Sequence, residues 1–126
     1  TYAASPEALQ GWRDHPRHVL VQADICDVEA VRAAFRTHRP VAVMHLAAES
    51  HVDRSIDGPA EFIRTNVVGT QVMLEAAREH WASVEGEAKA AFRFHHVSTD
   101  EVFGSLYPGD PPFTPETPYD PRSPYS

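Results

Sequence analysis

Hydrophobic and polar positions follow one another along the chain in blocks that predict strand, helix, strand, helix and strand. The predicted strand at residues 41–46 is a nearly continuous apolar run, and two further strands are predicted at residues 18–22 and 92–97. Unbroken hydrophobicity is typical of parallel strands that are covered on both faces. Helices that alternate with such strands supply the crossover connections. The pattern therefore predicts an α/β fold with a doubly wound parallel sheet.

The two main helices are bounded by residues that start or stop helices. Asp27 can cap a helix over residues 28–38, whose apolar side chains recur at helical spacing, and Pro40 ends it. A longer helix is predicted over residues 59–81. Its expected core stripe consists of Phe62, Ile63, Val67, Met73, Leu74 and Ala77.

Four further segments are predicted from shorter signals. Ser5 followed by a proline predicts a short capped helix that ends near Gly11. Residues 49–57 are polar and are expected to form a loop, and residues 85–90 are expected to be irregular. Residues 107–124 hold seven of the eleven prolines, which predicts an extended loop within residues 105–124.

A dinucleotide-binding sheet of this kind opens with a glycine-rich turn under the pyrophosphate. None of the six glycines here forms such a cluster. We therefore expect residues 1–126 to be part of one domain, with the first strand and the glycine-rich turn before Thr1. A C-terminal substrate domain is expected after Ser126.

The composition of the chain indicates which kinds of partner molecule and which cellular compartment to expect. The formal net charge is −7, which argues against nucleic acid because phosphate binding favours basic surfaces. No apolar stretch approaches the ~20 residues that cross a bilayer, so no membrane partner is expected. Cys26 is the single cysteine, and no secretory signal is visible. These features favour a reducing cytoplasm.

The strongest chemical signal follows the last predicted strand. Ser98, Thr99, Asp100 and Glu101 place two hydroxyls and two adjacent carboxylates at its carboxyl end, where open α/β sheets bind ligands. One carboxyl there could donate a proton while its neighbour accepts one. Paired carboxylates at the end of a buried strand are costly, which favours a functional role. Tyr125 could be a further proton-transfer group.

Other candidate residues have two interpretations. Asp24 follows a predicted strand and could bind an adenine amino group or a ribose hydroxyl, or could cap the next turn. The small residues after Leu46 could admit a cofactor close to the backbone, or could serve tight packing. Asn66 lies within a helix, where a buried amide needs partners, and is interpreted as structural.

The eight histidines are scattered along the chain. No pair has metal-ligand spacing with a carboxylate on the same face, so no metal site is predicted. His95 and His96 are adjacent in a predicted strand and should point to opposite faces. They are interpreted as core residues rather than ligands.

Five segments together carry a family resemblance: HLAAESHVDRSI (45–56), TNVVGT (65–70), HHVSTDEVFG (95–104), FTPETPY (113–119) and SPYS (123–126). The sequence resembles the extended short-chain dehydrogenase/reductase superfamily, and within it the nucleotide-sugar 4,6-dehydratases of the dTDP-glucose type. The resemblance implies a Rossmann-type NAD-binding domain that is incomplete at both ends. It also implies a dTDP-glucose substrate and a homodimer when the protein is complete.

The resemblance also implies site residues and a reaction. The positions that match NAD-binding positions are Thr1, Asp24, Ile25, Leu46, Ala47, Ala48, Ser50, Thr65, Ser98 and Tyr125; Ser50 and Thr99 match sugar-binding positions. The implied reaction oxidises the hexose at C4 with NAD, eliminates water across C5 and C6, and reduces C6. Glu101 would remove the C5 proton, Asp100 would protonate the 6-hydroxyl, Thr99 would bind the 4-oxygen, and Tyr125 would take the 4-hydroxyl proton.

Tyr125 matches the tyrosine of the Tyr-x-x-x-Lys signature, whose lysine would lie beyond Ser126. Three alternatives stay open: a UDP-glucose dehydratase, a related nucleotide-sugar epimerase or decarboxylase, and a fragment with no catalysis of its own.

Overall fold

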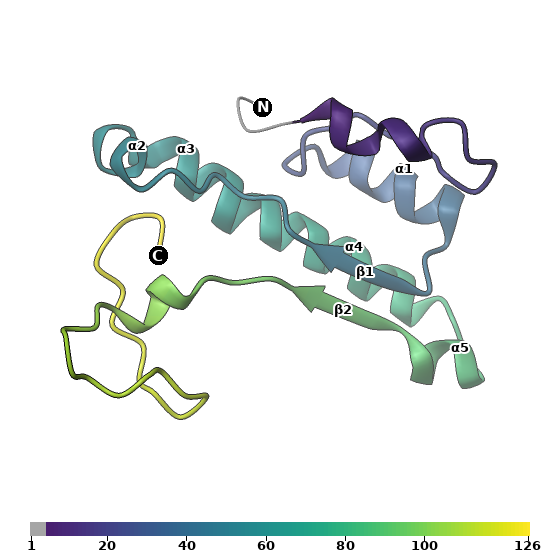
Figure 1. Ribbon diagram of the computed structural model, residues 1–126. Helices are drawn as coiled ribbons and strands as arrows, with labels where there is room; N and C mark the ends of the chain where they lie inside the picture. Colours follow the sequence, from purple (N-terminus) through teal and green to yellow (C-terminus); the bar gives the residue numbers. More distant parts are fainter. Residues whose placement is uncertain (1–4) are drawn as a thin grey trace.

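The computed structural model describes residues 5–126, which form helices packed beside a two-stranded parallel sheet (Figure 1). In chain order the elements are η1 (Pro6–Trp12), α1 (Val28–His38), β1 (Ala42–His45), α2 (Val52–Asp57), α3 (Pro59–Phe62), η2 (Ile63–Gly69), α4 (Thr70–Ala82), α5 (Gly86–Ala91), β2 (Arg93–His96) and η3 (Asp100–Phe103). The strands pair in the register Ala42↔Arg93 to His45↔His96. The predicted α/β class with a parallel sheet is confirmed.

The predicted helix α1 forms for the expected reasons. The Asp27 side chain accepts hydrogen bonds from the backbone N–H groups of Glu29 and Ala30, both at 3.1 Å. The helix ends at Arg39, which adopts the left-handed conformation with φ 42° and donates its N–H to the Phe35 carbonyl. The apolar face of α1 buries Val31 and Phe35 against α4, which forms the core.

The long predicted helix is also present, but its middle turns are π-helical. Helices α3, η2 and α4 follow one another without a loop. Phe62 and Ala77 are buried as predicted, whereas Ile63, Val67 and Leu74 are about half exposed. A wider π turn changes the angle between successive residues, so apolar positions before and after η2 do not share one face. The predicted core stripe is therefore wrong at those three positions.

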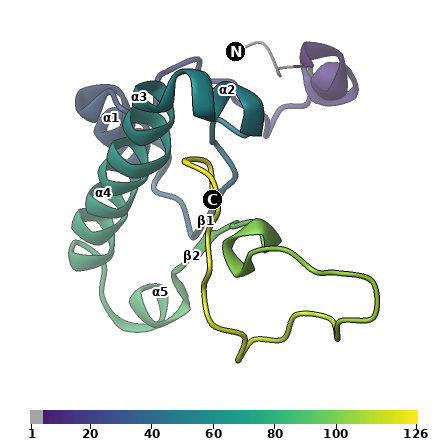
Figure 2. The ribbon, with the colours of Figure 1, turned by 90° about the vertical axis from the view of Figure 1, so that its left-hand side faces the viewer.

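Helices cover one face of the sheet. Figure 2 shows α1 and α4 on the same side of the two strands, where Val43 and Phe94 pack against the core. On the open face Met44 is 68% exposed. The prediction of strands buried on both faces is therefore wrong for these residues, because no layer of residues 5–126 covers the second face. His95 and His96 are exposed rather than core residues: His95 shares the open face with Met44, whereas His96 lies on the helix-covered face at the end of β2.

Several local predictions differ from the structure. Residues 18–22 form no strand: Val19, Leu20 and Val21 are at least half exposed, and strand formation depends on a pairing partner that this segment lacks within residues 5–126. The expected loops at 49–57 and 85–90 instead contain α2 and α5. The α5 residues are mostly good helix formers, which explains the difference.

The first helical segment, η1, is present near its predicted position but is a 3-10 helix. The Ser5 side chain does not cap it and instead donates to the Glu7 carboxylate at 3.2 Å.

No helix or strand occurs in residues 104–126, yet this segment is tied back to η3. The Asp120 N–H donates to the Val102 carbonyl at 2.9 Å. The Phe103 ring lies 5.3 Å from the Phe113 ring and 5.5 Å from the Tyr119 ring, measured between centroids. Gly104 has φ 94°, a conformation that favours glycine, and a Cβ there would lie 3.1 Å from the Asp120 carbonyl oxygen. These contacts return the C-terminal residues to the sheet edge.

Candidate functional site

The candidate site lies where both strands end. Because β1 and β2 are parallel, the segments that follow them leave the sheet at the same edge, and the Val97 N–H donates to the His45 carbonyl at 3.0 Å. The two segments, the α3–η2 helix and the C-terminal residues enclose a hollow of about 440 Å³. Its lining includes Leu46, Ala47, Ala48, Ser50, Asn66, Thr70, His96, Ser98, Thr99 and Tyr125.

A second hollow, of about 760 Å³, adjoins the first. Both are lined by Leu46, Ala47 and Ala48, so they meet over the segment that follows β1. The far part of the second hollow is lined by Asp24, Ile25, Glu61, Arg64 and Thr65. The structure therefore brings most of the predicted cofactor residues into two connected hollows. Thr1, also predicted, lies outside the described residues.

Asp24 caps the turn that follows it, one of its two predicted roles, and also forms an ion pair. Its carboxylate accepts from the Cys26 N–H at 2.8 Å, which closes the turn before α1, and pairs with the Arg64 guanidinium at 2.9 Å. The Cys26 backbone hydrogen bond, and then the bond to Arg64, lower the pKa of Asp24. The carboxylate therefore stays ionised, and its side chain is about half exposed toward the second hollow.

The loop that carries Asp24 packs tightly on the helix that carries Thr65. A Cβ on Gly69 would lie 2.6 Å from Ile25 Cδ1, so a larger residue there would displace the Ile25 side chain. The Cys26 thiol donates a hydrogen bond to the Arg64 carbonyl at 3.3 Å, and burial raises the pKa of this thiol. These contacts hold Ile25 and Thr65 in one wall of the second hollow.

Asn66 fixes the segment that follows β1. Its side-chain oxygen accepts from the Glu49 N–H and its amide donates to the Glu49 carbonyl, both at 2.8 Å. This two-point contact replaces the strand pairing that ends at His45. The structural interpretation of Asn66 is thus confirmed, and its contact positions the residues shared by the two hollows.

His45 is a residue whose importance the sequence analysis missed. It is 3% exposed, its Nε2 lies 3.1 Å from the Thr70 hydroxyl, and its ring lies 5.2 Å from the His96 ring. Burial, and then the charge of His96, lower the pKa of His45. A neutral histidine therefore lies beneath the floor of the first hollow. The available signal was a polar residue inside an otherwise apolar strand.

The Thr99–Glu101 segment begins η3 at the rim of the first hollow. The Thr99 hydroxyl caps this turn by accepting from the Glu101 N–H at 3.2 Å, and lies 3.5 Å from an Asp100 carboxylate oxygen. Thr99 lines the hollow together with Ser98. Asp100 is exposed and Glu101 half-buried on the next turn, beside the hollow rather than in its lining.

The C-terminal turn brings Tyr125 to the same hollow. The Ser126 hydroxyl accepts from the N–H groups of Arg122 and Ser123, at 3.3 and 3.2 Å. Tyr125 is half-buried and lines the hollow with Ser50 and Thr99. Residues from three distant parts of the sequence thus lie around one space.

The comparisons with known proteins identify the family. A family model described as GDP-mannose 4,6 dehydratase matches residues 1–126. The chain belongs to this family. The dTDP-glucose 4,6-dehydratase of Neisseria gonorrhoeae is 56% identical over 126 residues, which is all of this chain and 36% of that protein. The chain thus spans little more than a third of the length of this curated relative.

Solved structures of dehydratase-family relatives share the fold. DesIV, a dTDP-glucose 4,6-dehydratase from Streptomyces venezuelae with NAD bound, matches with a TM-score of 0.83 and 39% identity, over 99% of this chain and 35% of that chain. UDP-glucose 4-epimerase of Thermus thermophilus in complex with NAD matches with a TM-score of 0.69 and 30% identity, over 82% and 30%. The resemblance to nucleotide-sugar dehydratases and the Rossmann-type fold are confirmed.

Among residues 5–126, no helix combines the length and the apolar character that crossing a membrane requires.

Proposed function

We propose that this chain supplies the catalytic sheet edge of an NAD-dependent dTDP-glucose 4,6-dehydratase, a hydro-lyase. The observation that carries the proposal is the meeting of the two hollows at residues 46–48, with Ser98, Thr99 and Tyr125 around one of them. Relatives of that name are more than 50% identical to the whole chain.

The residues around the two hollows fit a dinucleotide. An ionised Asp24 at one end can accept hydrogen bonds from ribose or adenine. Ala47 and Ala48 leave the backbone open to close approach, and Ser98 offers a hydroxyl near the reacting end. The proposed NAD-binding residues are those predicted above: Thr1, Asp24, Ile25, Leu46, Ala47, Ala48, Ser50, Thr65, Ser98 and Tyr125.

The proposed chemistry assigns one proton transfer to each ionisable side chain. NAD, when bound, accepts a hydride from the sugar and later returns it. Tyr125 accepts the proton of the 4-hydroxyl, and the Thr99 hydroxyl donates a hydrogen bond to the 4-oxygen. The resulting ketone acidifies the C5 hydrogen, which Glu101 removes. Asp100 donates a proton to the 6-hydroxyl, which leaves as water. When the hydride returns to C6, Glu101 gives its proton back to C5, and the proton taken by Tyr125 replaces that of Asp100 through solvent.

The substrate, assembly and compartment belong to the same proposal. The substrate is dTDP-glucose, and UDP-glucose is the alternative that differs only in the nucleoside. The complete protein is proposed to act as a homodimer in the cytoplasm. Epimerisation is the second candidate reaction, since an NAD-bound epimerase shares the fold at 30% identity.

Product analysis of the full-length protein tests the proposal. After incubation with dTDP-glucose, mass spectrometry should show a product lighter by one water, the 4-keto-6-deoxy sugar. Epimerisation would leave the mass unchanged. UDP-glucose in a parallel reaction tests the choice of nucleoside, and an Asp100→Asn variant should form the lighter product more slowly. An isomer of unchanged mass as the main product would refute the dehydratase assignment.

A further inference from the structure

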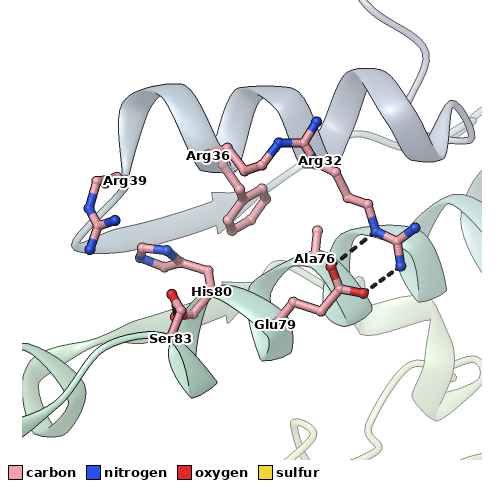
Figure 3. Close-up of a pocket in the computed structure, with 8 residues that line it drawn as sticks. Arg32, Arg36, Arg39, Ala76, Glu79, His80 and Ser83 are labelled. Atoms are coloured by element: carbon pink, nitrogen blue, oxygen red, sulfur yellow. Dashed lines mark hydrogen bonds and ion pairs between the residues drawn. The ribbon is translucent and has the colours of Figure 1, made fainter.

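A third hollow, of about 380 Å³, lies between α1 and α4, away from the candidate site (Figure 3). Arg32, Arg36 and Arg39 line its α1 side, and Glu79, His80 and Ser83 line its α4 side. It lies beside the amino end of β1, because α1 ends at His38 and β1 begins at Ala42. The candidate site lies at the opposite, carboxyl end of the same strand.

The charges in this hollow are unbalanced. Arg32 forms a two-point ion pair with Glu79, with the Arg32 Nε–Glu79 Oε2 bond at 3.0 Å, and this pairing lowers the pKa of Glu79. The single lining carboxylate is thereby hydrogen-bonded to Arg32, and the charge of Arg36 acts on it only at longer range. Within residues 5–126, the side chains of Arg36 and Arg39 have no hydrogen-bond or ion-pair partner. Two positive charges therefore remain open in a chain whose net charge is −7.

The base of the hollow is apolar and fixed. Phe35 and Ala76 are 7% and 3% exposed and belong to the core. His80 is held by its Nε2, which donates to the Pro40 carbonyl at 2.9 Å, and its ring lies 6.0 Å from the Phe35 ring. A carbonyl only accepts, so Nε2 carries the proton. Small-molecule sites commonly combine an apolar base with a few charged groups at this size.

We propose that this hollow binds a small organic phosphate. Guanidinium groups match phosphate oxygens in geometry and charge, and Arg36 on α1 and Arg39 just after it both line this hollow, so both can face one ligand. The apolar base between Phe35 and Ala76 accommodates the organic part. Binding here is separate from the sugar and cofactor chemistry, since none of these lining residues lines the other two hollows.

Calorimetric titration of the full-length protein tests this proposal, with NAD and dTDP saturating so that the candidate site is filled. The probes are phenyl phosphate, inorganic phosphate and phenol. We expect phenyl phosphate to bind more tightly than inorganic phosphate, and phenol not to bind. Exposed charge contacts are weak, so Arg36→Gln/Arg39→Gln should weaken phenyl phosphate binding by about fivefold.

The matched control is Arg13→Gln/Arg17→Gln, which removes the same charge from exposed residues outside the hollow. Equal weakening in both double variants, or no saturable binding to the parent protein, would overturn the proposal. If the variant fails to fold, phenylglyoxal labelling of the parent protein decides. Phenyl phosphate should protect Arg36 and Arg39 more than Arg13 and Arg17, and equal labelling would count against the site.

Discussion

Replacing Asn66 by alanine should loosen the segment on which both hollows of the candidate site depend. The Asn66 amide makes two part-buried hydrogen bonds of 2.8 Å to the backbone of Glu49. A hydrogen bond of this kind contributes about 1 kcal/mol net, so Asn66→Ala should lower the free energy of unfolding by about 2 kcal/mol. The backbone groups of Glu49 would lose their partners at the same time.

The same variant should also weaken cofactor retention. Residues 46–48 line both hollows and lie directly before Glu49. If their position depends on Asn66, the full-length Asn66→Ala protein should be purified with less NAD. With NAD added in excess, the KM of the variant for the nucleotide sugar should rise more than its kcat falls. An Asn66→Asp variant keeps the acceptor but loses the donor, and should be impaired as well.

Urea unfolding followed by circular dichroism measures the stability, and absorbance of the released cofactor measures the occupancy. Gln71→Ala is the control, because Gln71 is exposed on the neighbouring helix α4. If Asn66→Ala unfolds at the same urea concentration as Gln71→Ala and retains the same NAD, the Glu49 contact does not hold the site together.

Three further predictions concern the full-length protein. On mixing with substrate, the Glu101→Gln variant should still form NADH, seen by its absorbance. Its dehydration rate should fall by at least ~10²-fold, and exchange of the C5 hydrogen with heavy water should collapse. A dehydration rate near that of the parent protein would mean that another residue is the base. Asp24→Ala should lower NAD occupancy and leave the rate per bound NAD nearly unchanged, whereas a large loss of that rate would put Asp24 closer to the reaction. Because the pKa of His45 is lowered in the folded state, its stabilising effect is complete above the unfolded value near 6.5 and is lost as the pH falls below it. The difference between the urea midpoints at pH 8 and at pH 5.5 should therefore be smaller in the His45→Gln variant than in the parent protein. An equal difference in the two proteins would refute this role of His45.

Elements with strong local signals could be predicted from the sequence. Helix α1 has a capping aspartate, an apolar stripe and a terminating proline, and each acts within a few residues. The α3–α4 helix was predictable as an element, since Pro59 stands at its start and a long run of helix-compatible residues follows, but its core stripe was not. The segment at 18–22 shows the limit: its composition suits a strand, but a strand needs a neighbour, and residues 5–126 provide none.

The candidate site was predictable as a set of residues but not as an arrangement. Ser98 to Glu101 and Asp24 could be selected because each follows an expected strand. Asp24 pairs with Arg64, and Asn66 binds the backbone of Glu49. These contacts join residues that are far apart in the sequence, so no local pattern encodes them. His45 was missed because a buried histidine and a surface histidine look alike in sequence.

The register of the two strands decides which side chains meet at the site. His45 pairs with His96, so the residues at 46–48 and at 97–99 leave the sheet together. Side chains alternate between faces, so a slip of one residue would turn Phe94 from the helix-covered face to the open face and shift residues 97–99 along the sheet edge. The Val97–His45 hydrogen bond and the packing of Val43 and Phe94 on the helices oppose that slip. The hydroxyls near Tyr125 therefore depend on apolar contacts on the helix-covered face of the sheet, remote from any substrate.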